Sequence, residues 1–110
     1  FWPRGTVTDD YYAPVTSDRP VLLLSGENDP VTPPTWGEHV ARTLPRARHL
    51  VVPGAGHITL TRGCVPQIVA AFLDRGSVDG LDASCLQGLS RPPFFTGPAG
   101  VAGSAEVGLP

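Results

Sequence analysis

The sequence of 110 residues contains no lysine, no methionine and no long apolar run. Its positive charge comes from eight arginines scattered along the chain, which form no basic stripe for phosphate contacts. We therefore expect no nucleic-acid partner. No apolar run approaches the roughly 20 residues that cross a bilayer, so we expect no membrane span.

The absence of methionine also bears on domain organisation. The chain begins at Phe1, so we expect it to be the C-terminal piece of a longer protein, and the absence of a signal peptide from this sequence is uninformative. Glycine and proline, 13 residues each, concentrate in loops and from Pro92 onward. We expect residues 1–96 to belong to a folded domain and residues 97–110 to be a flexible Gly/Pro-rich tail.

Two apolar segments have the pattern of buried parallel strands. Residues 20–26 are apolar on both alternating faces, which predicts a central strand covered by helices on each side. Residues 48–53 predict a second strand, so 20–53 forms one strand–helix–strand unit of the α/β class. Two parallel strands do not complete a sheet, and the domain is therefore expected to be incomplete.

The segment between the two strands predicts a short helix. Thr35 and Glu38 have the spacing of a capping box, which would start the helix at Thr35, and Pro45 would close it. Four apolar residues recur at helical spacing and predict the buried face of this helix: Trp36, Val40, Ala41 and Leu44.

A second helix is predicted at residues 65–75. Pro66 is tolerated in its first turn, and Gly76 stands where a left-handed cap is favoured. A further helical turn is expected near residues 83–86. The apolar stripe of the second helix consists of Val65, Ile68, Val69, Phe72 and Leu73.

Asp29 and His57 follow the two predicted strands directly. The C-terminal ends of parallel strands meet at one edge of a sheet, where α/β folds place their sites. A carboxylate on one ring nitrogen orients an imidazole and stabilises its cation, so the pair has the chemistry of a general base. Two alternatives stay open: Asp29 as the acceptor of an Asx turn, and His57 as an ordinary loop histidine.

The other histidines and the serines are weaker candidates. His39 and His49 are expected to have surface roles, and the spacing of Asp29, His49 and His57 matches no standard zinc pattern, so no metal site is expected. A nucleophilic serine needs a Gly-x-Ser-x-Gly turn. Six serines occur and all lack that setting: Ser17, Ser25, Ser77, Ser84, Ser90 and Ser104.

Three segments together carry a resemblance to a known family. Residues 20–26, the string Asp-Pro-Val-Thr-Pro-Pro at 29–34 and the string Val-Val-Pro-Gly-Ala-Gly-His at 51–57 occur in this order. The chain resembles, over residues 2–95, the C-terminal segment of α/β-hydrolases of the tripeptidyl-aminopeptidase type, which are relatives of proline iminopeptidases.

The resemblance implies a function. Asp29 would be the acid and His57 the base of a triad whose serine comes from the missing N-terminal part. The reaction would be hydrolysis of a peptide, or of a small ester or amide substrate, through an acyl-enzyme and without cofactor. The remainder of the hydrolase domain would be the structural partner of this chain.

Cys64 and Cys85 flank the second predicted helix. The resemblance implies that they pair, and such a bond would stabilise the fold by about 3 kcal/mol in the chain-entropy model. It would also suit a secreted or cell-envelope enzyme. The alternative is two reduced, buried cysteines. A nucleophilic Cys64 is not expected, because Arg62 alone supplies positive charge nearby in the sequence.

Two other function classes remain open at this stage. The first is a non-catalytic or degenerate hydrolase fragment that acts as a binding module. The second is an α/β-hydrolase with an aspartate nucleophile, such as a dehalogenase. The residues upstream of Phe1 would distinguish them, because they would show which residue occupies the nucleophile turn.

Overall fold

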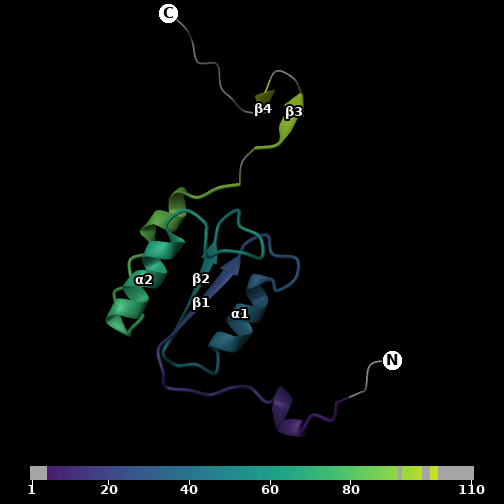
Figure 1. Ribbon diagram of the computed structural model, residues 1–110, viewed down its shortest axis with the longest axis vertical. Helices are drawn as coiled ribbons and strands as arrows, with labels where there is room; N and C mark the ends of the chain where they lie inside the picture. Colours follow the sequence, from purple (N-terminus) through teal and green to yellow (C-terminus); the bar gives the residue numbers. More distant parts are fainter. Residues whose placement is uncertain (1–4, 92, 98–99, 102–110) are drawn as a thin grey trace, which may run out of the picture.

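A computed structural model describes residues 5–91, 93–97 and 100–101 (Figure 1). The elements, in chain order, are the 3-10 helix η1 (Asp9–Tyr12), strand β1 (Val21–Gly26), helix α1 (Pro34–Ala41), strand β2 (Ala47–Val52), helix α2 (Val65–Arg75), the 3-10 helix η2 (Ser84–Gly88), and the short strands β3 (Phe95–Gly97) and β4 (Gly100–Val101).

Strands β1 and β2 pair in parallel, in a register that runs from Val21 opposite Ala47 to Gly26 opposite Val52. Helix α1 connects them and lies on one side of the pair, and α2 lies on the other (Figure 1). The predicted strand–helix–strand unit is therefore confirmed, with strand bounds within one residue of the expected ones. In the described part of the chain, β1 has β2 as its one partner, so the sheet is a partial α/β sheet.

The hydrophobic core lies between this sheet and α2. Val52 of β2 and Val65 of α2 are fully buried, and Ile68 lies beside them. Leu81 and Leu86 close the core from the segment that follows α2, and the β-strand residues Leu22, Leu24 and Leu50 pack against it. Ala55, in the loop that carries His57, belongs to the same core, which anchors this loop next to β2.

Helix α1 starts differently from the prediction. It begins at Pro34 with Pro33 as its N-cap, and no side chain caps its first turn, so the predicted capping box of Thr35 and Glu38 is wrong. Pro34 explains the start, because proline at the first helical position has its φ preset and no N–H to satisfy.

The predicted apolar face of α1 is also wrong in part. Leu44 is buried, but Trp36 is 66% exposed and Val40 is exposed as well. The helix ends at Ala41, and the N–H groups of the next three residues each bond to the carbonyl three residues back, which tightens the last turn toward Leu44. Trp36 and Val40 therefore do not belong to a buried helix face.

Helix α2 has the predicted bounds. Gly76 has a φ of 60° and its N–H donates to the carbonyl of Phe72, as a left-handed cap requires. One residue of the predicted stripe is wrong: Leu73 is exposed, because at eight positions from Val65 it has turned about 80° away from the buried line. The expected helical turn after α2 is the 3-10 helix η2.

The N-terminal segment lies along α1. The Thr43 hydroxyl donates to the carbonyl of Val15 at 2.6 Å, and a groove of about 310 Å³ opens between the two elements. The groove is lined by Tyr12, Ala13, Pro14, Val15, Trp36, His39, Val40 and Thr43.

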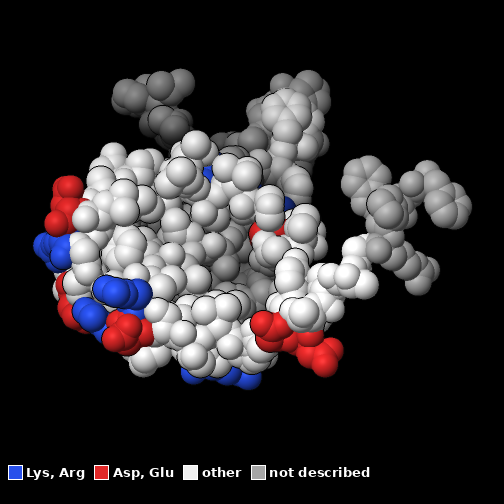
Figure 2. All heavy atoms as spheres, turned by 60° about the horizontal axis from the view of Figure 1, so that its bottom comes forward, with Lys and Arg blue, Asp and Glu red and all other residues white. Residues whose placement is uncertain are grey.

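The face shown in Figure 2 carries its charged side chains mainly at the margins, around an uncharged and hollowed centre.

The C-terminal segment holds a short hairpin, where β3 pairs antiparallel with β4. The expected flexible tail starts at Gly97, inside this hairpin, and its residues 98–99 and 102–110 lie outside the described residues. Within the described ranges, none of the helices combines the length and the apolarity that a membrane crossing needs.

Candidate active site

Two loops meet where β1 and β2 end. The N–H of Glu27 donates to the carbonyl of Val52 at 3.1 Å, and the N–H of Asn28 donates to the carbonyl of Ala55 at 2.9 Å. The loop after β1 is thereby bonded to the loop after β2. Both are loops at the C-terminal edge of a parallel pair, where α/β folds place their sites.

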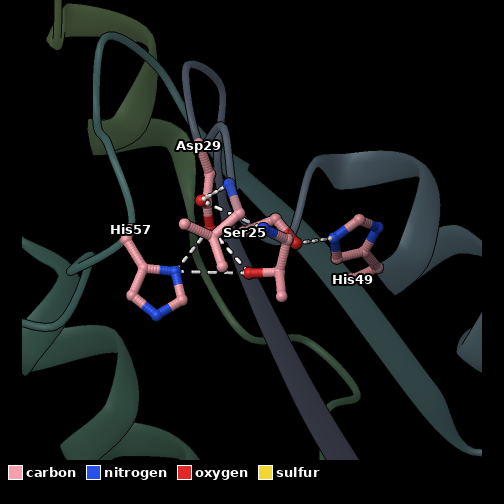
Figure 3. Close-up of polar contacts among 6 residues, drawn as sticks. Ser25, Asp29, His49 and His57 are labelled. Carbon is pink, nitrogen blue, oxygen red and sulfur yellow. Dashed lines mark hydrogen bonds and ion pairs between the residues drawn. The ribbon is translucent and has the colours of Figure 1, made fainter.

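Asp29 and His57 face each other across these loops. Asp29 Oδ2 lies 2.9 Å from His57 Nδ1 (Figure 3). The Asp29 side chain is 3% exposed and the His57 side chain is 53% exposed. The second ring nitrogen of His57 points away from Asp29 (Figure 3). The structure therefore brings together the two residues that the sequence paired, with the carboxylate inside and the imidazole open to an incoming group.

The Asp29 carboxylate also forms the Asx turn that the sequence offered as an alternative. The N–H groups of Val31 and Thr32 donate to Oδ1 at 2.8 and 3.1 Å. The Thr32 hydroxyl donates to Oδ2 at 2.7 Å, on the oxygen that faces His57. The Asx turn and the contact with His57 are therefore compatible, because Oδ1 accepts the N–H groups of the turn and Oδ2 contacts the imidazole.

These contacts determine the ionisation of Asp29. Burial alone would raise the pKa of its carboxyl, but hydrogen bonds from the Thr32 hydroxyl, from His57 and from two backbone N–H groups hold that pKa well below its usual range. An ionised carboxylate only accepts, so Nδ1 of His57 must carry the proton that lies between them. In the neutral ring, Nε2 is then free to accept a proton.

Asp29 should make the stability of the protein depend on pH. Its folded-state pKa is depressed, so its contribution is complete above the unfolded value of about 3.9 and is lost as the pH falls below it. We expect Asp29→Asn to lower the Tm of the full-length protein at neutral pH, and the difference from wild type to shrink below about pH 4. Thermal unfolding over a pH series measures this, and a constant difference would contradict it.

Glu27 and Gly26 hold the loops at close range. The Glu27 carboxylate accepts the N–H of Gly54 at 2.8 Å, which ties the loop of His57 to the loop of Asp29. A Cβ on Gly26 would lie 2.0 Å from the carbonyl oxygen of Gly56. Neither Glu27 nor Thr32 was predicted from the sequence as part of the site; the signal for Thr32 is its place three residues after an Asx-turn aspartate.

The remaining histidines lie apart from this pair. His39 is exposed on α1. His49 is half-buried in β2, and its Nε2 lies 2.9 Å from Ser25 Oγ on β1, so the expected surface role of His49 is wrong. The side chain of His49 lies beside Gly37 of α1, which covers this face of the strand. Among the described residues, no three side chains of the types that bind metals gather into a cluster.

Cys64 and Cys85 form a disulfide. It joins the N-cap of α2 to η2, so it ties together the two segments that contribute Val65 and Leu86 to the core. The pairing that the resemblance implied is present, and the alternative of two reduced cysteines does not hold in this structure.

Comparison with known proteins shows which family the sequence matches. The TAP-like protein family matches residues 1–85. Over 39 residues the chain is 49% identical to a protein of Mycobacterium tuberculosis, in strains CDC 1551 / Oshkosh and ATCC 25618 / H37Rv, that is named as a non-heme bromoperoxidase, BpoC. The match covers 36% of this chain and 15% of the length of these relatives. No solved structure gives a significant match.

The family match extends over both strands, both helices and both loops of the site. It includes Asp29, His57 and the two cysteines. The chain therefore belongs to the TAP-like family of α/β-hydrolases.

Proposed function

We propose that this chain supplies the acid and the base of a serine hydrolase that cleaves peptide, amide or ester bonds, and that its natural substrates are peptides cut near one end. The observation that carries the proposal is the contact of 2.9 Å between the buried Asp29 carboxylate and the exposed His57 ring. Such a pair can take a proton from a hydroxyl and give it to a leaving group.

The proposed mechanism follows from the state of each group. His57 Nε2 accepts the proton of a serine hydroxyl as its oxygen attacks the substrate carbonyl, and Asp29 stabilises the imidazolium that forms. His57 then gives this proton to the departing amine or alcohol. A water molecule, activated in the same way, cleaves the acyl-enzyme. The serine would come from a part of the protein outside residues 1–110, because no serine here has the required turn.

The surroundings of the pair support a substrate surface. Val31 stands two residues after Asp29, and Ile58 and Leu60 follow His57, and all three side chains are exposed. They lie on the two loops that hold the pair. Apolar side chains beside an open imidazole suit contact with an apolar part of a substrate or with the rest of the hydrolase domain.

The proposal is tested on the full-length protein with a fluorophosphonate probe, which labels an activated serine. We expect one labelled serine outside residues 1–110, and loss of labelling and of aryl-ester hydrolysis in His57→Ala. His39→Ala, a change of an exposed histidine on α1, is the matched control and should keep both. Labelling that survives His57→Ala would contradict the proposed base.

A peptide series tests the exopeptidase part separately. Peptides with a free N-terminus should be cleaved, and the same peptides with an acetylated N-terminus should not, since an aminopeptidase binds the terminal amine. Equal cleavage of the free and the acetylated peptides would contradict the exopeptidase part of the proposal, without affecting the serine hydrolase part.

We also propose that the protein works outside the cytoplasm, as a secreted or cell-envelope enzyme. The disulfide between Cys64 and Cys85 supports this, because such bonds persist in oxidising compartments. Fractionation of the source cells, followed by detection of the protein, tests the location.

A further inference from the structure

Thr32 contacts both members of the pair. Its hydroxyl oxygen lies 2.7 Å from Asp29 Oδ2 and 3.3 Å from His57 Nδ1, and its N–H lies 3.1 Å from Asp29 Oδ1 (Figure 3). One residue thus reaches both oxygens of the carboxylate and the protonated side of the imidazole.

The hydroxyl has one proton, and the ionised carboxylate can only accept, so this proton goes to Oδ2. The lone pairs of the Thr32 hydroxyl oxygen then remain free to accept the proton on His57 Nδ1. That proton is shared between Oδ2 at 2.9 Å and the Thr32 oxygen at 3.3 Å. The three groups close a small ring of hydrogen bonds that opposes rotation of both the carboxylate and the imidazole.

We propose that Thr32 is a positioning residue for the Asp29/His57 pair: its hydroxyl orients Oδ2 and supplies the second acceptor for the proton on Nδ1. The inference rests on the proposed function, because it concerns the same acid and base. Thr32 acts through the two side chains and contacts no substrate.

The surroundings of Thr32 argue for this role over a purely structural one. The residue is exposed, and the hydrogen bonds of its hydroxyl go to Asp29 and His57. Its backbone N–H closes the Asx turn whatever its side chain is. Removal of the hydroxyl should therefore leave the turn in place and free the carboxylate and the ring to rotate.

The test uses the full-length protein and hydrolysis of an aryl ester. Thr32→Val keeps the shape of the side chain and removes the hydroxyl; we expect kcat to fall roughly 10- to 100-fold with little change in KM, the scale of one hydrogen bond to a charged group. Thr32→Ser restores the hydroxyl and should stay within about threefold of wild type. Thr35→Val, on the exposed first turn of α1, is the matched control and should leave kcat unchanged.

A double-mutant cycle with Asp29→Asn separates positioning from folding. If Thr32 acts through Asp29, Thr32→Val lowers the residual kcat of the Asp29→Asn protein by less than about twofold. An equal fold-loss of kcat in the wild-type and Asp29→Asn backgrounds would overturn the proposal, because a structural defect would act in both. A wild-type kcat in the Thr32→Val protein would also overturn it.

The outcomes distinguish this inference from the proposed function. Normal turnover in both Asp29→Asn and His57→Ala would overturn the proposed function and the role of Thr32 with it. Loss of activity in those two variants, with normal activity in Thr32→Val, would overturn the role of Thr32 alone.

Discussion

Asp29→Asn should lower the kcat of the full-length protein by roughly 10⁴-fold, the magnitude of the corresponding change in a serine protease. Two backbone N–H groups already donate to Oδ1, so the one oxygen of the new amide stays there. Its NH₂ group then faces Thr32 and His57. When an amide N–H donates to Nδ1, the ring proton must sit on Nε2 instead. Nε2 can then no longer accept the proton of the serine hydroxyl, so the imidazole cannot act as the base.

The measurement is steady-state hydrolysis of an aryl ester or peptide, together with the Tm to show that the protein remains folded. Asp82→Asn is a matched control. Asp82 also accepts a backbone N–H two residues ahead, from Ser84 at 2.9 Å, and it lies just before η2. We expect Asp82→Asn to keep the wild-type kcat. His57→Ala should be at least as damaging as Asp29→Asn, and near-normal turnover in either would show that the base lies elsewhere.

The sequence predicts the position of the pair well because chain connectivity determines it. A parallel strand, a crossover helix and a second parallel strand return the chain to the same edge of the sheet. Asp29 and His57 therefore come together although 28 positions separate them. The apolar segments at residues 20–26 and 48–53 are enough to predict the two strands that carry this geometry.

The errors in α1 have a different origin. The predicted start rests on the capping-box spacing at Thr35 alone, whereas the proline at position 34 is also a helix start, because its φ is preset. The proline start prevails. The exposed Trp36 shows that helical spacing indicates which residues share a face, but it does not show what lies opposite that face in this chain.

The contacts that refine the site could not be read from local pattern. Thr32 and His57 are 25 positions apart, and Glu27 and Gly54 are 27 apart. Each contact depends on how two loops cross after the strands have paired. The sequence also presented the Asx turn and the catalytic carboxylate as alternatives, whereas in the structure Oδ1 of Asp29 closes the turn and Oδ2 lies against His57, so the two are compatible.

Gly26→Ala is expected to have the second large effect, because Gly26 lies where the two loops cross. A Cβ there would lie 2.0 Å from the carbonyl oxygen of Gly56 and 2.7 Å from that of Ala55. Both atoms belong to the backbone, so no side-chain rotation relieves the overlap. The hydrogen bond between Asn28 and Ala55 holds the same loops together at 2.9 Å. The methyl group must therefore push the His57 loop away from Asp29.

A displacement of about 1 Å in a reacting pair costs on the order of 100-fold in rate, so we expect at least this loss of kcat. The overlap should also destabilise the fold by about 1–3 kcal/mol, as overpacking does elsewhere. Gly88→Ala is the matched control, since a Cβ at Gly88 meets nothing within 4 Å. Steady-state kinetics and thermal unfolding of the full-length variants measure both effects. Wild-type kcat and Tm in Gly26→Ala would show that the loops can separate without loss, and that their close crossing does not hold Asp29 against His57.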